Sequence, residues 1–154
     1  MEYKVKDVTR VIEEFAPLSI QEGWDNSGLC VGSPEAPVTS VLLGLDCTEE
    51  LVDEAVACGA DMIVTHHPLI FSGLKKISPE DQTGAAVIKA IKAGISVYAA
   101  HTSADKVIAG VSGARRQDWV LRMSPSWTRT ARERDSVWSE TFRNRCRPRR
   151  RWPS

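Results

Sequence analysis

Residues 1–110 alternate between segments with helical periodicity and short runs of consecutive apolar residues. A helix is predicted over residues 7–15, and Pro17 ends it. Its apolar face is formed by Val8, Val11, Ile12 and Phe15. Three short apolar runs have the length and composition of buried strands: residues 41–46, 62–65 and 95–100. Residues 23–29 are rich in turn-forming residues and are expected to be irregular.

Two further helices are predicted between these strands. Thr48 can cap a helix over residues 49–58, which has acidic residues in its first turn and Gly59 as its stop. Its apolar stripe comprises Leu51, Val52, Ala55 and Val56. Thr83 can cap a second helix, stopped by Gly94, whose apolar residues are Val87, Ile88 and Ile91. Strands separated by helices of this length predict an α/β fold of βαβ units with a mainly parallel sheet.

Length and composition agree with one soluble domain. The chain has 154 residues, of which 42% are hydrophobic and 26% are charged. We find no apolar run long enough to span a membrane and no apolar signal segment near Met1, so we expect a cytoplasmic protein. The four cysteines (Cys30, Cys47, Cys58 and Cys146) have no Cys-x-x-Cys spacing, which favours neither a disulfide framework nor a zinc knuckle.

The net charge of zero conceals two segments of opposite charge. Residues 1–110 carry 8 Lys and Arg against 16 Asp and Glu, for a net charge of −8. Residues 111–154 carry 12 Arg and 4 acidic residues, for a net charge of +8, and hold four of the five tryptophans. We therefore place a boundary near Val111.

All three histidines of the chain follow predicted strands. His66 and His67 come directly after residues 62–65, and His101 follows residues 95–100, with Asp105 four residues further on. Asp46 ends the first apolar run. In open α/β sheets, ligands bind beyond the carboxyl ends of the strands, so these side chains are expected to share one edge of the sheet.

Imidazoles and a carboxylate are suitable ligands for zinc, manganese or iron. Adjacent histidines diverge, so His66 and His67 suit two neighbouring metal ions better than one, and two-metal sites activate water. A His-His pair by itself is more often the polar end of a loop, and it is the convergence with His101 and Asp105 that favours metal binding.

Other residues near this edge have ordinary explanations as well. Asp46 is a candidate site residue but equally a capping or loop-stabilising residue. Trp24 and Asn26 are expected to serve packing and a turn rather than substrate contact. Lys75 and Lys76 follow the histidine loop and are suited to an anionic substrate, although a solvated lysine pair is the more ordinary explanation.

Four ordered motifs stand out in the first part of the chain: Trp24-Asp25-Asn26-Ser27-Gly28-Leu29-Cys30-Val31-Gly32, Leu45-Asp46-Cys47-Thr48, Thr65-His66-His67-Pro68-Leu69-Ile70-Phe71 and Tyr98-Ala99-Ala100-His101-Thr102-Ser103-Ala104-Asp105. Together they resemble the Nif-three-like family, whose members are often called GTP cyclohydrolase I type 2 homologues. The resemblance covers about residues 1–113.

The resemblance implies an α/β lobe with a dinuclear divalent-metal centre, a ring-shaped homohexamer, and a metal-dependent hydrolase whose small-molecule substrate is unsettled. It matches His66, His67 and Asp105 to metal ligands and places His101 in the same site. The remaining family ligands, a His and a Glu, come from near the end of a much longer chain. We therefore expect only part of the site within residues 1–113.

Residues 114–154 are predicted to be out of frame. When the possible codons of residues 117–120 are read in a frame shifted by one base, they must encode a Leu-Gly pair. In the same shifted frame, the codons of residues 132–142 can encode Gly-Thr-Gly-Leu-Gly-Leu-Val-Gly-Asp-Leu-Pro. These resemble the segments that the family carries after its first lobe. A one-base slip in the reading frame near residues 111–114 explains both the Leu-Gly pair and the segment permitted over residues 132–142. The Arg- and Trp-rich segment that the slip produces is then expected to be disordered.

The alternative is a non-enzymatic module that binds nucleic acid or a protein partner through the basic segment. Guanidinium groups neutralise phosphate and indole rings stack on bases. On the frame-slip hypothesis, such binding would be non-specific. The salt dependence of nucleic-acid binding distinguishes the two hypotheses.

Overall fold

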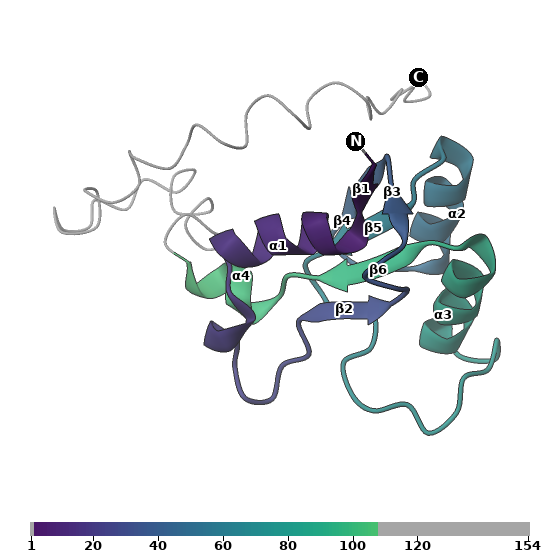
Figure 1. Ribbon diagram of the computed structural model, residues 1–154. Coiled ribbons are helices and arrows are strands. Elements are labelled where there is room, and N and C mark those ends of the chain that lie inside the picture. Colours follow the sequence, from purple (N-terminus) through teal and green to yellow (C-terminus); the bar gives the residue numbers. More distant parts are fainter. Residues whose placement is uncertain (1, 108–154) are drawn as a thin grey trace, which may run out of the picture. The chain divides into compact units, whose positions relative to one another are not determined.

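A four-stranded sheet with the order β2-β6-β5-β4 forms the centre of the computed structural model, which describes residues 2–107 (Figure 1). The strands are β4 (Val41–Gly44), β5 (Met62–Thr65), β6 (Ser96–Ala99) and β2 (Gly28–Val31). Strands β4, β5 and β6 are parallel, and β2 pairs antiparallel with β6. The predicted α/β fold with a mainly parallel sheet is confirmed.

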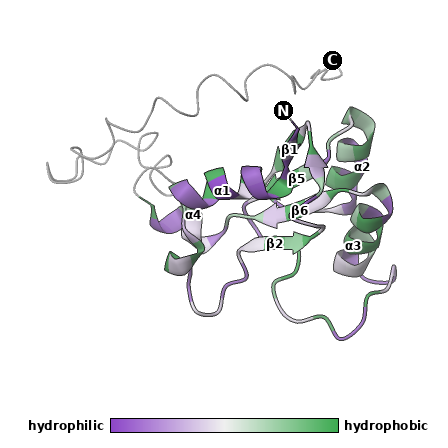
Figure 2. Cartoon of the chain, viewed as in Figure 1, coloured by the Kyte–Doolittle hydropathy of each residue, from purple (hydrophilic) through white to green (hydrophobic). Residues whose placement is uncertain are grey.

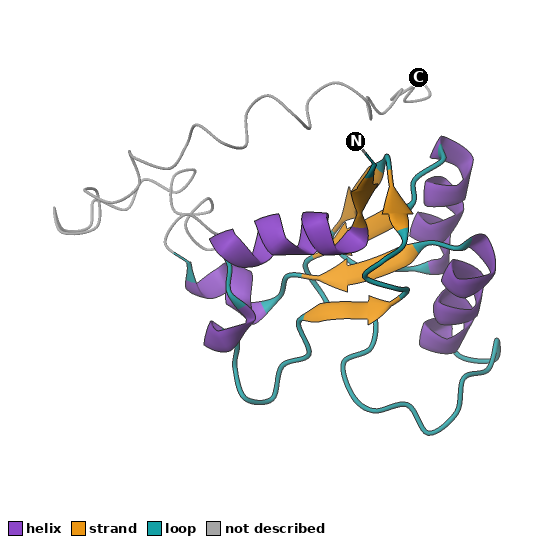
Figure 3. Cartoon of the chain, in the orientation of Figure 1, coloured by secondary structure: helices purple, strands orange, loops and turns teal. Residues whose placement is uncertain are grey.

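Helices cover both faces of this sheet (Figure 3). The helices are α1 (Val5–Phe15), the 3-10 helix η1 (Leu18–Ile20), α2 (Glu49–Cys58), α3 (Gln82–Ala93) and α4 (Thr102–Lys106). A small antiparallel pair, β1 (Tyr3–Lys4) with β3 (Pro37–Val38), accompanies α1. The interpretation of residues 114–154 as a separate, out-of-frame segment lies outside the described residues.

Alternate residues of the central strands supply two cores. Ile63 and Val97 pack with α2 and α3, where Val52 is fully buried. Met62 and Tyr98 point to the opposite face and pack with α1. Helix α1 shows both green and purple along its length in Figure 2, because Val5 and Ile12 are buried in this second core while its polar residues face solvent. Among residues 2–107, no helix combines the length and the apolar character needed to cross a membrane.

Helix α2 begins and ends at the predicted capping residues, Thr48 and Gly59. Thr48 Oγ1 accepts a hydrogen bond from the backbone N–H of Leu51, and Gly59 adopts a left-handed conformation (φ 70°) that ends the helix. The predicted bounds of α2 and β5 are confirmed. Strands β4 and β6 are shorter than the predicted runs, and α1 begins two residues earlier than predicted.

Several sequence predictions are wrong in detail. The cap of α3 is Asp81, whose Oδ1 accepts a hydrogen bond from the Gly84 N–H, and not Thr83. Val56 and Ile91 are exposed, because each lies at the outer margin of its helical stripe. Residues 28–29 belong to β2 rather than to an irregular stretch, and neither β1 nor β3 was predicted.

Candidate metal centre

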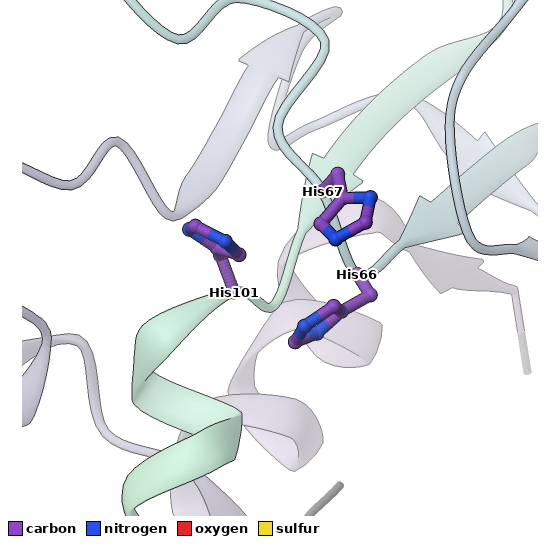
Figure 4. A group of neighbouring side chains, drawn as sticks. All are labelled: His66, His67 and His101. Atoms are coloured by element: carbon purple, nitrogen blue, oxygen red, sulfur yellow. The ribbon is translucent and has the colours of Figure 1, made fainter.

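The three histidines meet at the carboxyl edge of the sheet (Figure 4). His66 and His67 follow β5, and His101 lies between β6 and α4. Because β5 and β6 are parallel and in register, with Thr65 beside Ala99, the two strand ends bring these residues together. One potential ligand atom from each histidine lies within 4.8 Å of the others.

Each imidazole is anchored through Nδ1 to a hydrogen-bond acceptor. His66 Nδ1 lies 3.0 Å from the Ala100 carbonyl oxygen, and His67 Nδ1 lies 2.6 Å from Asp46 Oδ1. His101 Nδ1 lies 2.8 Å from Asp25 Oδ1. A carbonyl or carboxylate oxygen has no proton to donate, so Nδ1 carries the proton, and in the neutral imidazole Nε2 then keeps its lone pair. This is the tautomer that binds a metal ion through Nε2.

Asp105 approaches the same cluster from α4. Its Oδ2 lies 3.6 Å from His66 Nε2. Two ligand atoms that are each about 2.1 Å from one tetrahedral ion lie roughly 3.4 Å apart, so this separation suits two ligands of a shared ion. The structure therefore brings His66, His67 and His101 together and places Asp105 beside His66, and the donor chemistry of these side chains fits a divalent metal.

Asp25 is a positioning residue that the sequence analysis assigned no role. Its side chain is fully buried (0% exposed) beside His101. Asp25 Oδ2 accepts hydrogen bonds from Ser27 Oγ at 2.8 Å, from the Thr102 N–H at 3.0 Å and from Thr102 Oγ1. Burial opposes ionisation, but the hydrogen bonds from Thr102, His101 and Ser27 outweigh it and hold the pKa of Asp25 well below its usual range. A permanent carboxylate therefore orients the His101 ring.

Strand β2 explains how Asp25 reaches a histidine that is 76 residues away in sequence. Antiparallel pairing sets Gly28 beside Ala99, so the residues before Gly28 lie next to those after Ala99. The His101 N–H donates to Ser27 Oγ at 3.2 Å, which extends this link beyond the strand. The only sequence signal for Asp25 was its place in the Trp24–Gly32 motif.

The other candidates take different positions. Asp46 orients the His67 ring through the contact between Asp46 Oδ1 and His67 Nδ1. Asn26 donates through Nδ2 to the Ile70 carbonyl at 2.5 Å, and this bond links two loops that are 44 residues apart rather than closing a local turn. Trp24 is 61% exposed and lies outside the core, and its packing is limited to the rings of Phe71 and His101. Lys75 and Lys76 are both exposed, as expected of a solvated pair.

The cysteines near the site are poor nucleophiles. Cys47 is buried directly after Asp46, and burial, with the neighbouring Cys30 thiol, raises its pKa to about 12. Burial also raises the pKa of Cys30. Both thiols are therefore protonated at neutral pH, and neither offers the thiolate that attack on a substrate or metal ligation requires. Cys30, Cys47 and Cys58 are all free thiols.

A cavity of about 570 Å³ opens beside His67. Its walls include the beginnings of α2 and α3 and the loop that follows the histidine pair. Its acidic lining residues are Asp46, Glu49, Glu50, Glu80 and Asp81. This concentration of carboxylates disfavours a phosphate group in that cavity.

An α/β lobe with a histidine and carboxylate cluster at the carboxyl edge of its sheet defines a candidate metal-binding protein. Sequence comparison identifies the family, because residues 3–119 match Duf34/NIF3 (NGG1p interacting factor 3). The chain belongs to this family, which confirms the resemblance drawn from the four motifs.

Relatives from bacteria are similar to this chain over the same region. The chain is 45% identical over 114 residues to a "GTP cyclohydrolase 1 type 2 homolog" of Clostridium acetobutylicum, covering 74% of this chain and 42% of the relative. It is 44% identical over 109 residues to the protein of the same name from Clostridium perfringens, covering 71% of this chain and 42% of that relative. The chain thus spans less than half the length of these relatives.

Solved structures agree in fold. The Bacillus cereus protein related to NIF3 superposes with a TM-score of 0.72 at 38% identity, covering 75% of this chain and 32% of that one. A Staphylococcus aureus hypothetical protein superposes with a TM-score of 0.71 at 37% identity, covering 74% of this chain and 32% of that one.

Proposed function

We propose that this chain contributes part of a dinuclear divalent-metal centre to a hydrolase that acts on a small molecule. The observation that carries the proposal is the set of three imidazoles, each held at Nδ1 by an acceptor and each left with Nε2 as a donor atom. His66, His67 and Asp105 would hold the ions, and His101 lines the same site. Divalent ions such as zinc, manganese or iron supply Lewis acidity and activate water for hydrolysis.

The chain's own residues prepare this site before any ion binds. The Ala100 carbonyl, Asp46 and Asp25 fix the three tautomers, so little rotamer freedom is lost on metal binding. His66 is largely buried, whereas His67 is half exposed and faces the cavity. This difference in exposure favours His67 as the side that a substrate approaches.

Metal content tests the proposal directly. Mass spectrometry of protein dialysed against zinc, manganese or iron should show metal in the wild type and less metal in the double variant His66→Ala/His67→Ala. Lys75→Ala/Lys76→Ala is the matched control, because it removes two exposed cationic side chains from the following loop. Equal metal content in all three proteins would overturn the assignment. The name of the relatives makes GTP one substrate to assay, and the carboxylates that line the cavity beside His67 predict that its triphosphate does not bind in that cavity.

The site is proposed to be completed by other parts of the family fold. The relatives are more than twice as long as the matched region, and we propose that residues 1–113 form the N-terminal lobe of such a protein. We further propose that residues 114–154 arise from a one-base frame slip. Sequencing the DNA across codons 108–120 tests this, and a sequence that leaves no such slip would refute it.

Self-association of the complete protein is part of the same proposal. Restoring the frame is expected to give a longer chain that assembles into a ring-shaped homohexamer with two metal ions per subunit. Size-exclusion chromatography with light scattering, together with metal counting, tests both expectations. A stop codon shortly after the restored frame, or a monodisperse ring with full metal content already formed by the 154-residue chain, would contradict them.

The charge of residues 111–154 supports the alternative function of binding nucleic acid. With a net charge of +8, this segment is expected to bind polyanions with an affinity that falls steeply with salt. Sequence-independent binding agrees with the frame-slip hypothesis. Sequence-specific binding that persists at high salt would favour a genuine nucleic-acid module instead.

A further inference from the structure

Two exposed aromatic rings adjoin the histidine cluster. Trp24 is 61% exposed and Phe71 is 52% exposed. Their ring centroids are 5.9 Å apart with an interplanar angle of 45°. Both rings also contact the His101 ring edge to face, with centroid distances of 6.2 Å for Trp24 and 6.3 Å for Phe71. The pair therefore lies directly beside the candidate metal centre.

The two rings come from loops that the fold holds together. Trp24 precedes Asp25, whose buried carboxylate is fixed by His101 and Thr102. Phe71 follows Ile70, whose carbonyl accepts the 2.5 Å hydrogen bond from Asn26 Nδ2. Both rings are thus positioned by hydrogen bonds of their neighbours rather than by burial of their own surfaces. A preorganised surface of this kind loses little entropy when it binds a ligand.

The size of the pair indicates what can cover it. A buried Trp or Phe side chain removes about 150–250 Å² from water, so the exposed parts of these two amount to roughly 250 Å². A stable protein interface needs about 800 Å² on each partner. A flat aromatic ring matches the smaller area, and offset or tilted stacking on aromatic side chains favours such a ring.

We propose that Trp24 and Phe71 bind a planar aromatic ring of the substrate and hold it beside the metal centre. Because the two rings already contact each other, the ligand ring lies against their outer faces rather than between them. This inference rests on the proposed metal-dependent function, since it assigns the ring to that substrate. The carboxylate-lined cavity on the His67 side is left for substituents that are neutral or cationic.

Binding of guanosine, with ribose as the probe that lacks the ring, tests the proposal. Saturation-transfer NMR should show contact between the protein and the base protons of guanosine, and no contact with ribose. Trp24→Leu and Phe71→Leu should each weaken guanosine binding about tenfold, which is the size expected for losing one stacking partner. Tyr3→Leu is the matched control, because Tyr3 is an equally exposed aromatic residue (62%) in β1.

The ring site and the metal site can fail separately. Metal content should be unchanged in Trp24→Leu and Phe71→Leu, so loss of guanosine binding with full metal content supports the ring site. Absence of guanosine binding by the wild type, or equal binding by all four proteins, would overturn the ring site whatever the metal measurements show. A change in molecular mass on Trp24→Leu, measured by light scattering, would also overturn it by assigning the rings to contact between copies.

Discussion

Replacing Asp25 by asparagine tests how far the buried carboxylate supports the candidate metal centre. The side chain keeps its size but loses its charge, and an NH2 group, which donates hydrogen bonds and accepts none, replaces one of the two carboxylate oxygens. If the amide takes the place of Oδ1, the His101 Nδ1–H and the Asn26 N–H lose their acceptor. If it takes the place of Oδ2, the Thr102 N–H loses its acceptor. Either orientation leaves at least one backbone or ring N–H unpaired.

The expected loss follows from these contacts. One unpaired buried donor costs about 1–3 kcal/mol, and the remaining hydrogen bonds lose their charge assistance, so we expect the free energy of unfolding to fall by about 3 kcal/mol. Because the His101 ring is then no longer held in one tautomer, metal affinity should fall about 10- to 100-fold. Urea unfolding in the presence of EDTA measures the first effect, and metal titration of the folded protein measures the second.

Asp61→Asn is the matched control for this experiment. Asp61 Oδ2 also accepts backbone hydrogen bonds, from Thr39 at 2.7 Å and from Ser40 at 3.1 Å, but Asp61 lies immediately before β5, at the opposite end of the strand from the histidines. We expect it to lose stability while keeping wild-type metal affinity. The reasoning would be refuted if Asp25→Asn kept wild-type metal affinity, or if both variants lost metal in proportion to their loss of stability.

Three further predictions concern the scaffold. Gly32→Ala should destabilise the fold by more than about 2 kcal/mol in urea unfolding, because φ is 105° and a Cβ atom would lie 2.3 Å from Ser96 Oγ. Ile63→Ala should cost about 2–5 kcal/mol in the same assay, since Ile63 is fully buried in β5; a loss below 1 kcal/mol would contradict its place in the core. The hydrogen bond from Lys4 lowers the pKa of Glu35 from 4.5 to about 2, so its contribution to stability is present above pH 4.5 and lost as the pH falls through 2. Glu35→Gln should therefore reduce the change in unfolding midpoint across this pH range, and an unchanged profile would contradict the ion pair.

Local sequence patterns were sufficient for the elements that depend on neighbouring residues. Helix α2 begins at its Thr48 cap and ends at Gly59, and both signals lie within one turn of the helix end that they set. Helix α3 shows the limit of such signals, because Asp81 and Thr83 are both good caps. The structure has Asp81 as the cap of α3. The preceding loop also packs closely against Gly84, where a Cβ atom would lie 2.1 Å from the Ser78 carbonyl oxygen.

The sequence by itself determined that residues 41–101 alternate strands and helices, and that His66, His67 and His101 end neighbouring parallel strands. The hydrophobic period and the alternation of strands and helices along the chain are enough for that conclusion, because the parallel strands of βαβ units end at the same edge of the sheet. Only the tertiary structure decided that β2 joins β6 in antiparallel fashion and brings Asp25 to His101. It also decided that Trp24 is exposed rather than packed in the core. Pairing across more than 70 residues depends on which edge of the sheet is left open, and no pattern within residues 23–31 carries that information.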